Sequence, residues 1–215
     1  IDARSALKDT KALISRTRDD ALFLSVAAQW NEPLAKRVIA VLGQIKVISG
    51  LRDRDYQPYS ARMAQEPDTG RAKLLLDACR NADLGIEDIK VEERELDPEA
   101  VSRLAPLLNT ATNTMNPRDR KWVEQNVLLE HPKYSHGQKV GMVAFNLEKD
   151  ASEGTRKYFR MMGPIIDTLE KGYTLIVDEL EAKLHPLLTR SIVRLFQSSQ
   201  SNPKNAQIVF CTHDT

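Results

Sequence analysis

The fold class of this chain follows from one run in its carboxy-terminal part, Tyr173-Thr174-Leu175-Ile176-Val177-Asp178-Glu179. Residues that favour β structure lead directly into two adjacent carboxylates. An apolar run without polar alternation is typical of a parallel strand that is covered on both faces of its sheet. Ligands of open α/β sheets bind outside the carboxyl ends of such strands. We therefore expect an α/β fold with Asp178 and Glu179 at the edge of the sheet where a ligand binds.

The two carboxylates suit the chemistry of phosphoryl transfer. Asp178 would hold Mg²⁺ through water, because this ion keeps most of its hydration shell. Glu179 would orient, or accept a proton from, the water that attacks a γ-phosphate. The alternative is a buried strand that simply ends in two solvated acids, so the neighbouring motifs have to decide between the two interpretations.

A second motif lies upstream, where residues 152–155 read Ser-Glu-Gly-Thr before a helical pattern. The apolar positions of that pattern are Tyr158, Phe159, Met162, Ile165, Ile166 and Leu169. A small hydroxyl residue and a glycine at a helix amino terminus leave backbone N–H groups free, and the helix dipole favours an anion there. Ser152, Gly154 and Thr155 are therefore candidate phosphate ligands, and the alternative is an ordinary capped helix.

A third motif follows the strand expected at residues 206–210, where Cys211 and Thr212 lead to His213. A histidine at that strand end can donate a hydrogen bond to a γ-phosphate beside the acids of the neighbouring strand. The alternative is a structural or exposed histidine. Between the two strands, residues 181–186 read Glu-Ala-Lys-Leu-His-Pro and turn the chain into a helix, with His185 in a structural role.

The order of these motifs resembles the carboxy-terminal lobe of ABC-class ATPases. Within that class the chain is most similar to the predicted ATPases related to the OLD, RecF and SMC proteins, an AAA family of the phage-defence type. That group has an SEGT-type signature, a VDE Walker B strand, an LHP segment and a TTHD switch. The corresponding residues here are 152–155 (SEGT), 177–179 (VDE), 184–186 (LHP) and 211–214 (CTHD). The resemblance is strong from residue 140 to residue 215.

The resemblance implies a P-loop NTPase fold, ATP and Mg²⁺ as cofactors, and a homodimer that sandwiches two nucleotides head to tail. It implies three kinds of site residue: Ser152, Gly154 and Thr155 for nucleotide binding, Asp178 for the metal ion, and Glu179 and His213 for catalysis. The ATPase head would control a DNA-related or anti-phage effector, such as a nuclease or a toxin.

Two other functions are compatible with these motifs. One is an ATP-gated scaffold or sensor that regulates a partner nuclease or toxin with little or no turnover. Lys183 favours it, because the family has a small serine at this place in the turn after Walker B, and Glu181 stands where aspartate is usual. The other is a transporter ATPase, against which the helix-rich first half and the lack of a membrane-coupling signal argue.

One motif of the family is missing. No Gly-x-x-x-x-Gly-Lys-Ser/Thr run occurs in the 215 residues, although that loop supplies the N–H cradle and the lysine for the phosphates. The chain also begins without methionine, so we expect the P-loop segment upstream. We divide the chain into residues 1–120, a mainly helical lobe or insertion, and residues 121–215, the ABC-type ATPase lobe.

The pattern of each part predicts its elements. In the first part we expect helices over residues 21–28 and 33–45, a loop over 51–68, a further helix through Cys79, a short strand at 89–91 and a helix from residue 97. In the second part, runs at 122–130 and 138–147 indicate a β-hairpin. A helix, a strand, a helix and a strand then follow, the alternation that produces parallel sheets.

Composition limits the partners and the compartment. Thirty-one basic and 30 acidic residues give a net charge of +1, so the whole chain has no electrostatic signature of nucleic-acid or membrane binding, although a local basic patch is compatible with it. No apolar run approaches the length of about 20 residues that spans a bilayer, and we expect a cytoplasmic protein. Cys79 and Cys211 are expected to be buried, reduced thiols, and the alternative is a disulfide.

Overall fold

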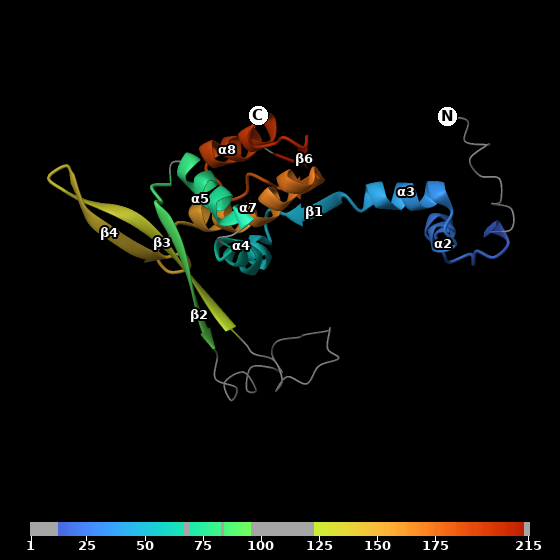
Figure 1. Cartoon of the computed structure of the whole chain (residues 1–215), viewed down its shortest axis with the longest axis horizontal. Coiled ribbons are helices and arrows are strands. Elements are labelled where there is room, and N and C mark those ends of the chain that lie inside the picture. Colours follow the sequence, from blue (N-terminus) through green and yellow to red (C-terminus); the bar gives the residue numbers. More distant parts are fainter. Residues whose placement is uncertain (1–12, 67–68, 83, 96–122, 213–215) are drawn as a thin grey trace.

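The computed structural model describes residues 13–66, 69–82, 84–95 and 123–212. Its elements are, in chain order, α2 (Phe23–Gln29), α3 (Pro33–Leu42), β1 (Ile45–Ser49), the short 3₁₀ helix η1 (Asp53–Tyr56), α4 (Gln57–Ala64), α5 (Arg71–Asn81), β2 (Asp88–Glu95), β3 (Val123–Ser135), β4 (Gln138–Asn146), α7 (Glu153–Lys171), β5 (Thr174–Asp178), α8 (Pro186–Gln197) and β6 (Gln207–Phe210). Helices packed on a parallel sheet confirm the α/β class (Figure 1).

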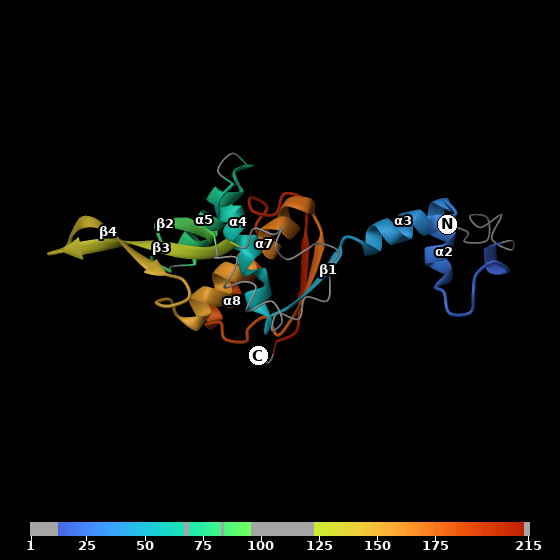
Figure 2. The ribbon, with the colours of Figure 1, turned by 90° about the horizontal axis from the view of Figure 1, so that it is seen from below.

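The parallel sheet has the order β1-β5-β6, with β5 at its centre (Figure 2). Both pairings are parallel, and Val47, Ile176 and Val209 lie in one row across the three strands. Leu175 and Val177 point to the opposite face of β5, where both are fully buried. The predicted order of helix, strand, helix and strand after the hairpin is confirmed, because α7, β5, α8 and β6 follow one another and β5 pairs with β6.

One face of this sheet carries apolar side chains that the described part of the chain does not cover. Val47 is 71% exposed and Val209 is 54% exposed, while Ile176 between them is half-buried. Parallel sheets normally have both faces covered by helices. The open row therefore marks a surface against which a further layer can pack.

Helix α7 packs against the covered face of the parallel sheet. Its residues from Lys157 to Gly163 are all buried, and it contacts η1, α4, α5, α8 and β5. Helix α4 crosses it so closely that a Cβ on Gly163 would lie 2.5 Å from the hydroxyl oxygen of Ser60. That hydroxyl donates to the carbonyl oxygen of Arg160 (2.7 Å). It replaces the helical hydrogen bond that residue 164 would otherwise donate, because Pro164 has no N–H. No helix in the described ranges is both long and apolar enough to cross a bilayer.

A second, antiparallel sheet of order β2-β3-β4 projects beside the helices (Figures 1 and 2). The hairpin of β3 and β4 and the strand β2 are confirmed. Strands β2 and β3 are longer than expected, whereas β4 ends at Asn146 and not at residue 147. The turn is made by His136 and Gly137, which both have positive φ (50° and 78°), as a two-residue turn of type I′ requires.

The first half of the chain differs from the expectation in two places. Ile45 fits the apolar spacing of a helix, but it begins strand β1, because it pairs with Thr174 of β5. Residues 51–68 were expected to be a loop, yet η1 and α4 form there, with Pro58 tolerated in the first turn of α4. Both sheets take strands from either side of residue 120, so the division into two parts does not separate the sheets. The helix expected from residue 97 lies outside the described residues.

The two cysteines have different surroundings. Cys79 is buried in α5 and its thiol is free, as expected. Cys211 is also free but exposed, so the expectation that both are buried was wrong. Cys211 follows β6, the edge strand of the sheet, and nothing in the described part of the chain covers it. Burial raises the pKa of the Cys79 thiol to about 12.

Alkylation should therefore distinguish the two thiols. Near pH 8, iodoacetamide should modify Cys211 in the folded protein and leave Cys79 unmodified, because only a thiolate reacts and Cys79 is neither ionised nor accessible. In urea both should react. Intact mass spectrometry counts the adducts, and a second adduct on the folded protein would contradict the burial of Cys79.

Candidate functional site

The two predicted acids lie at the carboxyl end of the central strand. Asp178 is the last residue of β5 and stands opposite Ser49, the last residue of β1. The Asp178 side chain is exposed, and the Glu179 side chain is half-buried. Neither carboxylate has a side-chain hydrogen bond or ion pair with another described residue. Both acids are therefore free to receive a ligand at the edge of the sheet where one was expected.

The turn after β5 has an unusual backbone. Glu179 (φ 53°) and Lys183 (φ 64°) both lie in the left-handed region. For residues other than glycine this region costs roughly 1–2 kcal/mol each. The turn is closed by hydrogen bonds from the Ala182 N–H to the Glu179 carbonyl (3.3 Å) and from the Leu184 N–H to the Glu181 carbonyl (2.8 Å). A turn with two such residues needs support from its surroundings.

Lys157 of α7 supplies that support. Its side chain is fully buried (0% exposed). Its ammonium group donates to the backbone oxygens of Glu179 at 3.3 Å, Leu180 at 3.0 Å and Ala182. An ammonium has three N–H bonds, so every donor is used. Burial lowers the pKa of Lys157, and the nearby carboxylates oppose that shift.

Gly50, the residue after β1, packs against the turn. Its N–H donates to the Asp178 carbonyl at 2.7 Å. A Cβ at this position would lie 2.1 Å from the Glu179 backbone oxygen, a distance that no side chain tolerates. The Glu179 peptide is thus held by both Lys157 and Gly50. The sequence analysis identified neither residue. Lys157 could have been noticed, because it is a lysine beside the apolar positions Tyr158 and Phe159 of a helix expected to be buried.

The predicted phosphate ligands lie at the start of α7, beside the same turn. Ser152 is the N-cap: its hydroxyl accepts from the Thr155 N–H (3.1 Å) and contacts the Thr155 hydroxyl (2.8 Å). A Cβ on Gly154 would lie 3.3 Å from the Lys183 carbonyl oxygen, so the helix start and the turn are in close contact. The fold therefore brings residues 152–155 and 178–183 together. His213 lies outside the described residues, and His185 caps α8 by accepting from the Leu187 N–H (3.3 Å), in the structural role expected for it.

A polar cavity of about 270 Å³ opens at this place, between the start of α7, the turn and the segment after β1. It is lined by cationic and acidic side chains, namely Arg52, Asp53, Arg54, Asp55, Glu153, Arg156, Arg160 and Lys183, and by Leu51. Arg160 is committed to Asp53 (2.7 Å), whereas Arg52 and Arg54 have no ion pair with a described residue. The cations outnumber the acids, so the cavity favours an anion.

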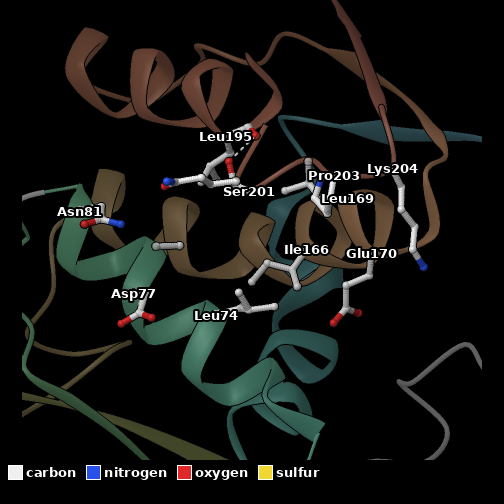
Figure 3. Close-up of a pocket in the computed structure, with 12 residues that line it drawn as sticks. Leu74, Asp77, Asn81, Ile166, Leu169, Glu170, Leu195, Ser201, Pro203 and Lys204 are labelled. Carbon is white, nitrogen blue, oxygen red and sulfur yellow. Dashed lines mark hydrogen bonds between the residues drawn. The ribbon is translucent and has the colours of Figure 1, made fainter. Parts of the chain in front are cut away.

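A second cavity, of about 510 Å³, lies between α5, α7 and α8 (Figure 3). Leu74, Ile166, Leu169 and Leu195 form its apolar lining, with Lys204 at its edge. It lies against the carboxy-terminal half of α7. None of the predicted site residues in the described part of the chain lines either cavity, but Glu153 at the start of α7 and Lys183 of the turn line the polar one. The polar cavity is therefore the one that adjoins the candidate site.

Asp178 fits the Mg²⁺ ion that the resemblance to ABC-class ATPases implies. No group of three or more His, Cys, Asp or Glu that could hold a metal ion occurs among the described residues. Mg²⁺ in nucleotide sites needs only one or two carboxylates, because waters and substrate phosphates complete its octahedron. One exposed, unpaired carboxylate at the strand end meets that requirement.

The contact between Gly50 and Glu179 predicts a sharp difference between two Gly→Ala variants. Gly50→Ala should lower the free energy of unfolding by about 1–3 kcal/mol or more, because the new methyl group overlaps the Glu179 backbone. Gly141→Ala is the matched control, since no atom lies within 4 Å of its Cβ position, and it should change stability by less than about 1 kcal/mol. Urea denaturation measures both, and equal stabilities would contradict the close contact.

Two comparisons place the chain among known proteins. It is similar to a DNA topoisomerase 1 of Campylobacter jejuni, with 31% identity over 98 residues, and the match covers 42% of this chain and 14% of the topoisomerase. The chain thus spans about a seventh of that relative. The family model described as "AAA domain, putative AbiEii toxin, Type IV TA system" matches residues 2–215. Because this match takes in nearly all of the sequence, the chain belongs to this family of AAA domains, which are in general nucleotide-binding P-loop ATPases.

Proposed function

We propose that this chain is the catalytic part of an ATP-hydrolysing head, which a P-loop lobe completes and which dimerises around ATP. One observation carries the proposal: Asp178 and Glu179 stand at the carboxyl end of β5, beside the amino terminus of α7. A metal-binding acid, a base and a helix terminus suited to an anion therefore meet at one edge of the sheet. Hydrolysis of ATP depends mostly on positioning and charge stabilisation, which such an edge provides.

Each residue has a role in the protomer's own nucleotide site. Asp178 holds Mg²⁺, which when bound neutralises charge on the β- and γ-phosphates. Glu179 lies next to it and orients the attacking water or accepts its proton. His213 follows β6, the strand beside β5, and donates a hydrogen bond to the γ-phosphate. The exposure of Asp178 and the lack of a competing partner among the described residues support this assignment.

The start of α7 serves the nucleotide held by the opposite protomer. Ser152, Gly154 and Thr155 present a hydroxyl and backbone N–H groups to its γ-phosphate, where the helix dipole adds favourable charge. The polar cavity with Arg52 and Arg54 adds positive charge at the same place. A site divided between two protomers makes hydrolysis conditional on dimerisation.

The open face of the parallel sheet supports the need for a P-loop lobe. Val47 and Val209 are exposed there, and no other described strand pairs with the outer edge of β6. A lobe that covers this apolar row would also bring its phosphate-binding loop to the carboxyl ends of β5 and β6. These 215 residues contain no P-loop motif, so the activity is that of the completed head.

The head controls an effector, a nuclease or a toxin, in a DNA-related or anti-phage process. The toxin named in the family's description and the partial similarity to a DNA topoisomerase favour this role. The alternative is an ATP-gated scaffold with little turnover. Lys183 favours it, because this lysine stands in the turn beside Gly154 and places its ammonium 3.8 Å from Glu153, where a dimer contact is expected.

ATP hydrolysis by the complete gene product tests the proposal, with Glu179→Gln beside the wild type. Loss of the base should lower kcat by about 10²–10⁴-fold. The variant should bind ATP and accumulate as a dimer, which mass measurement in solution detects. Glu92→Gln, an exposed substitution on β2, is the matched control and should behave as the wild type.

The other outcomes separate the alternatives. Wild-type turnover that Glu179→Gln leaves intact would remove Glu179 as the base. Tight ATP binding without turnover in either protein would favour the scaffold. A complete gene product that does not bind ATP would exclude both functions.

A further inference from the structure

We infer that Lys157 is a positioning residue that couples the two nucleotide sites of the dimer. The inference rests on the proposed function, in which the start of α7 serves one nucleotide and Glu179 serves the other. Lys157 lies in α7, five residues after Ser152. The ammonium group of its side chain donates to the carbonyl oxygens of Glu179, Leu180 and Ala182. Its ammonium group is thus a direct link between the elements that contact the two nucleotides.

The link acts on the backbone from which the proposed base projects. Glu179 has a φ of 53°, a conformation that its own local preferences oppose. Its carbonyl oxygen accepts from Lys157 at 3.3 Å, and Gly50 stands against the same peptide. Because these contacts decide the direction of the Glu179 side chain, a shift of Lys157 would move the carboxylate relative to the attacking water.

The start of α7 is tied to both ends of the turn. Lys157 holds residues 179–182, and Gly154 lies against the carbonyl of Lys183. When the helix start engages a γ-phosphate, the turn must therefore follow the helix. Binding at one site thereby aligns the base at the other.

A comparison with Arg160 separates this role from ordinary stabilisation. Arg160 is also cationic and buried on α7, but it pairs with Asp53 (2.7 Å) and donates to Gln57 (2.8 Å), neither of which belongs to the turn. Lys157 has no direct ion pair with a described carboxylate, and its donors go to backbone oxygens of the turn. Its contacts therefore bear on the geometry of Glu179.

The complete gene product tests the inference with Lys157→Met, which keeps the length of the side chain and removes its charge. We expect kcat to fall by about 100-fold, because a misplacement of about 1 Å costs that much, while the KM for ATP changes less than about threefold. Lys157→Arg keeps the charge and should recover part of kcat. Ile165→Ala, another fully buried change on α7 away from the turn, is the control for lost stability.

Hydrogen exchange gives a readout that does not need turnover. In the Glu179→Gln background, ATP should slow the exchange of the amides of residues 180–184, and adding Lys157→Met should remove this protection. ATP-dependent dimerisation should persist in the double variant, because the start of α7 is unchanged. A merely structural lysine would instead raise exchange equally with and without ATP.

The results distinguish failure of the inference from failure of the proposed function. Wild-type turnover together with normal kcat in Lys157→Met, or with an equal loss of kcat in Ile165→Ala, would overturn the coupling and leave the ATPase intact. A wild type that neither hydrolyses ATP nor dimerises with it would overturn the proposed function. In that case, equal exchange of residues 180–184 with and without ATP would overturn the coupling as well.

Discussion

The burial of two cations on helix α7 is the constraint on which the rest of the described structure depends. An uncompensated buried charge costs several kcal/mol, so Lys157 and Arg160 must each find oxygen partners. Lys157 donates hydrogen bonds to the carbonyl oxygens of the turn after β5. Arg160 forms an ion pair with Asp53 and donates to Gln57, both in the segment after β1. One helix thereby fixes both segments at the carboxyl edge of the sheet, where the candidate site lies.

The candidate site lies at this edge of a sheet that is covered on one face only. The acids, the helix start and a cavity rich in cations meet there, yet the opposite face of the sheet exposes Val47 and Val209. A parallel sheet gains its stability from cover on both faces. The exposed face and the lack of a P-loop motif in these 215 residues are the two observations behind the proposal that a P-loop lobe completes the head. They agree with the family to which the chain belongs, whose ATPases bind the phosphates with a P-loop.

Sequence patterns were sufficient where the deciding interactions are local. The apolar run of β5 and the helical spacing of α7 are read from neighbouring residues, and these elements formed as expected. The hairpin also formed, but its turn is made by residues 136 and 137 alone, because β3 continues through the connection expected at 131–137. Ile45 shows the limit of this method. Its spacing suits a helix, but it is a strand residue, because its partner Thr174 lies far away in the sequence. Cys211 was misjudged for the same reason, since exposure at a sheet edge depends on which strands are neighbours.

By itself, the sequence determined the α/β class and the motifs that place Asp178 and Glu179 at a strand end and Ser152 at a helix start. Only the tertiary structure decided that these groups meet, that Gly50 must lack a side chain, and that Lys157 holds the turn beneath Glu179. The physical reason is that propensity and periodicity act over a few residues. The partner of a buried charge, and the space left for a methyl group, depend instead on segments that only the complete fold brings together.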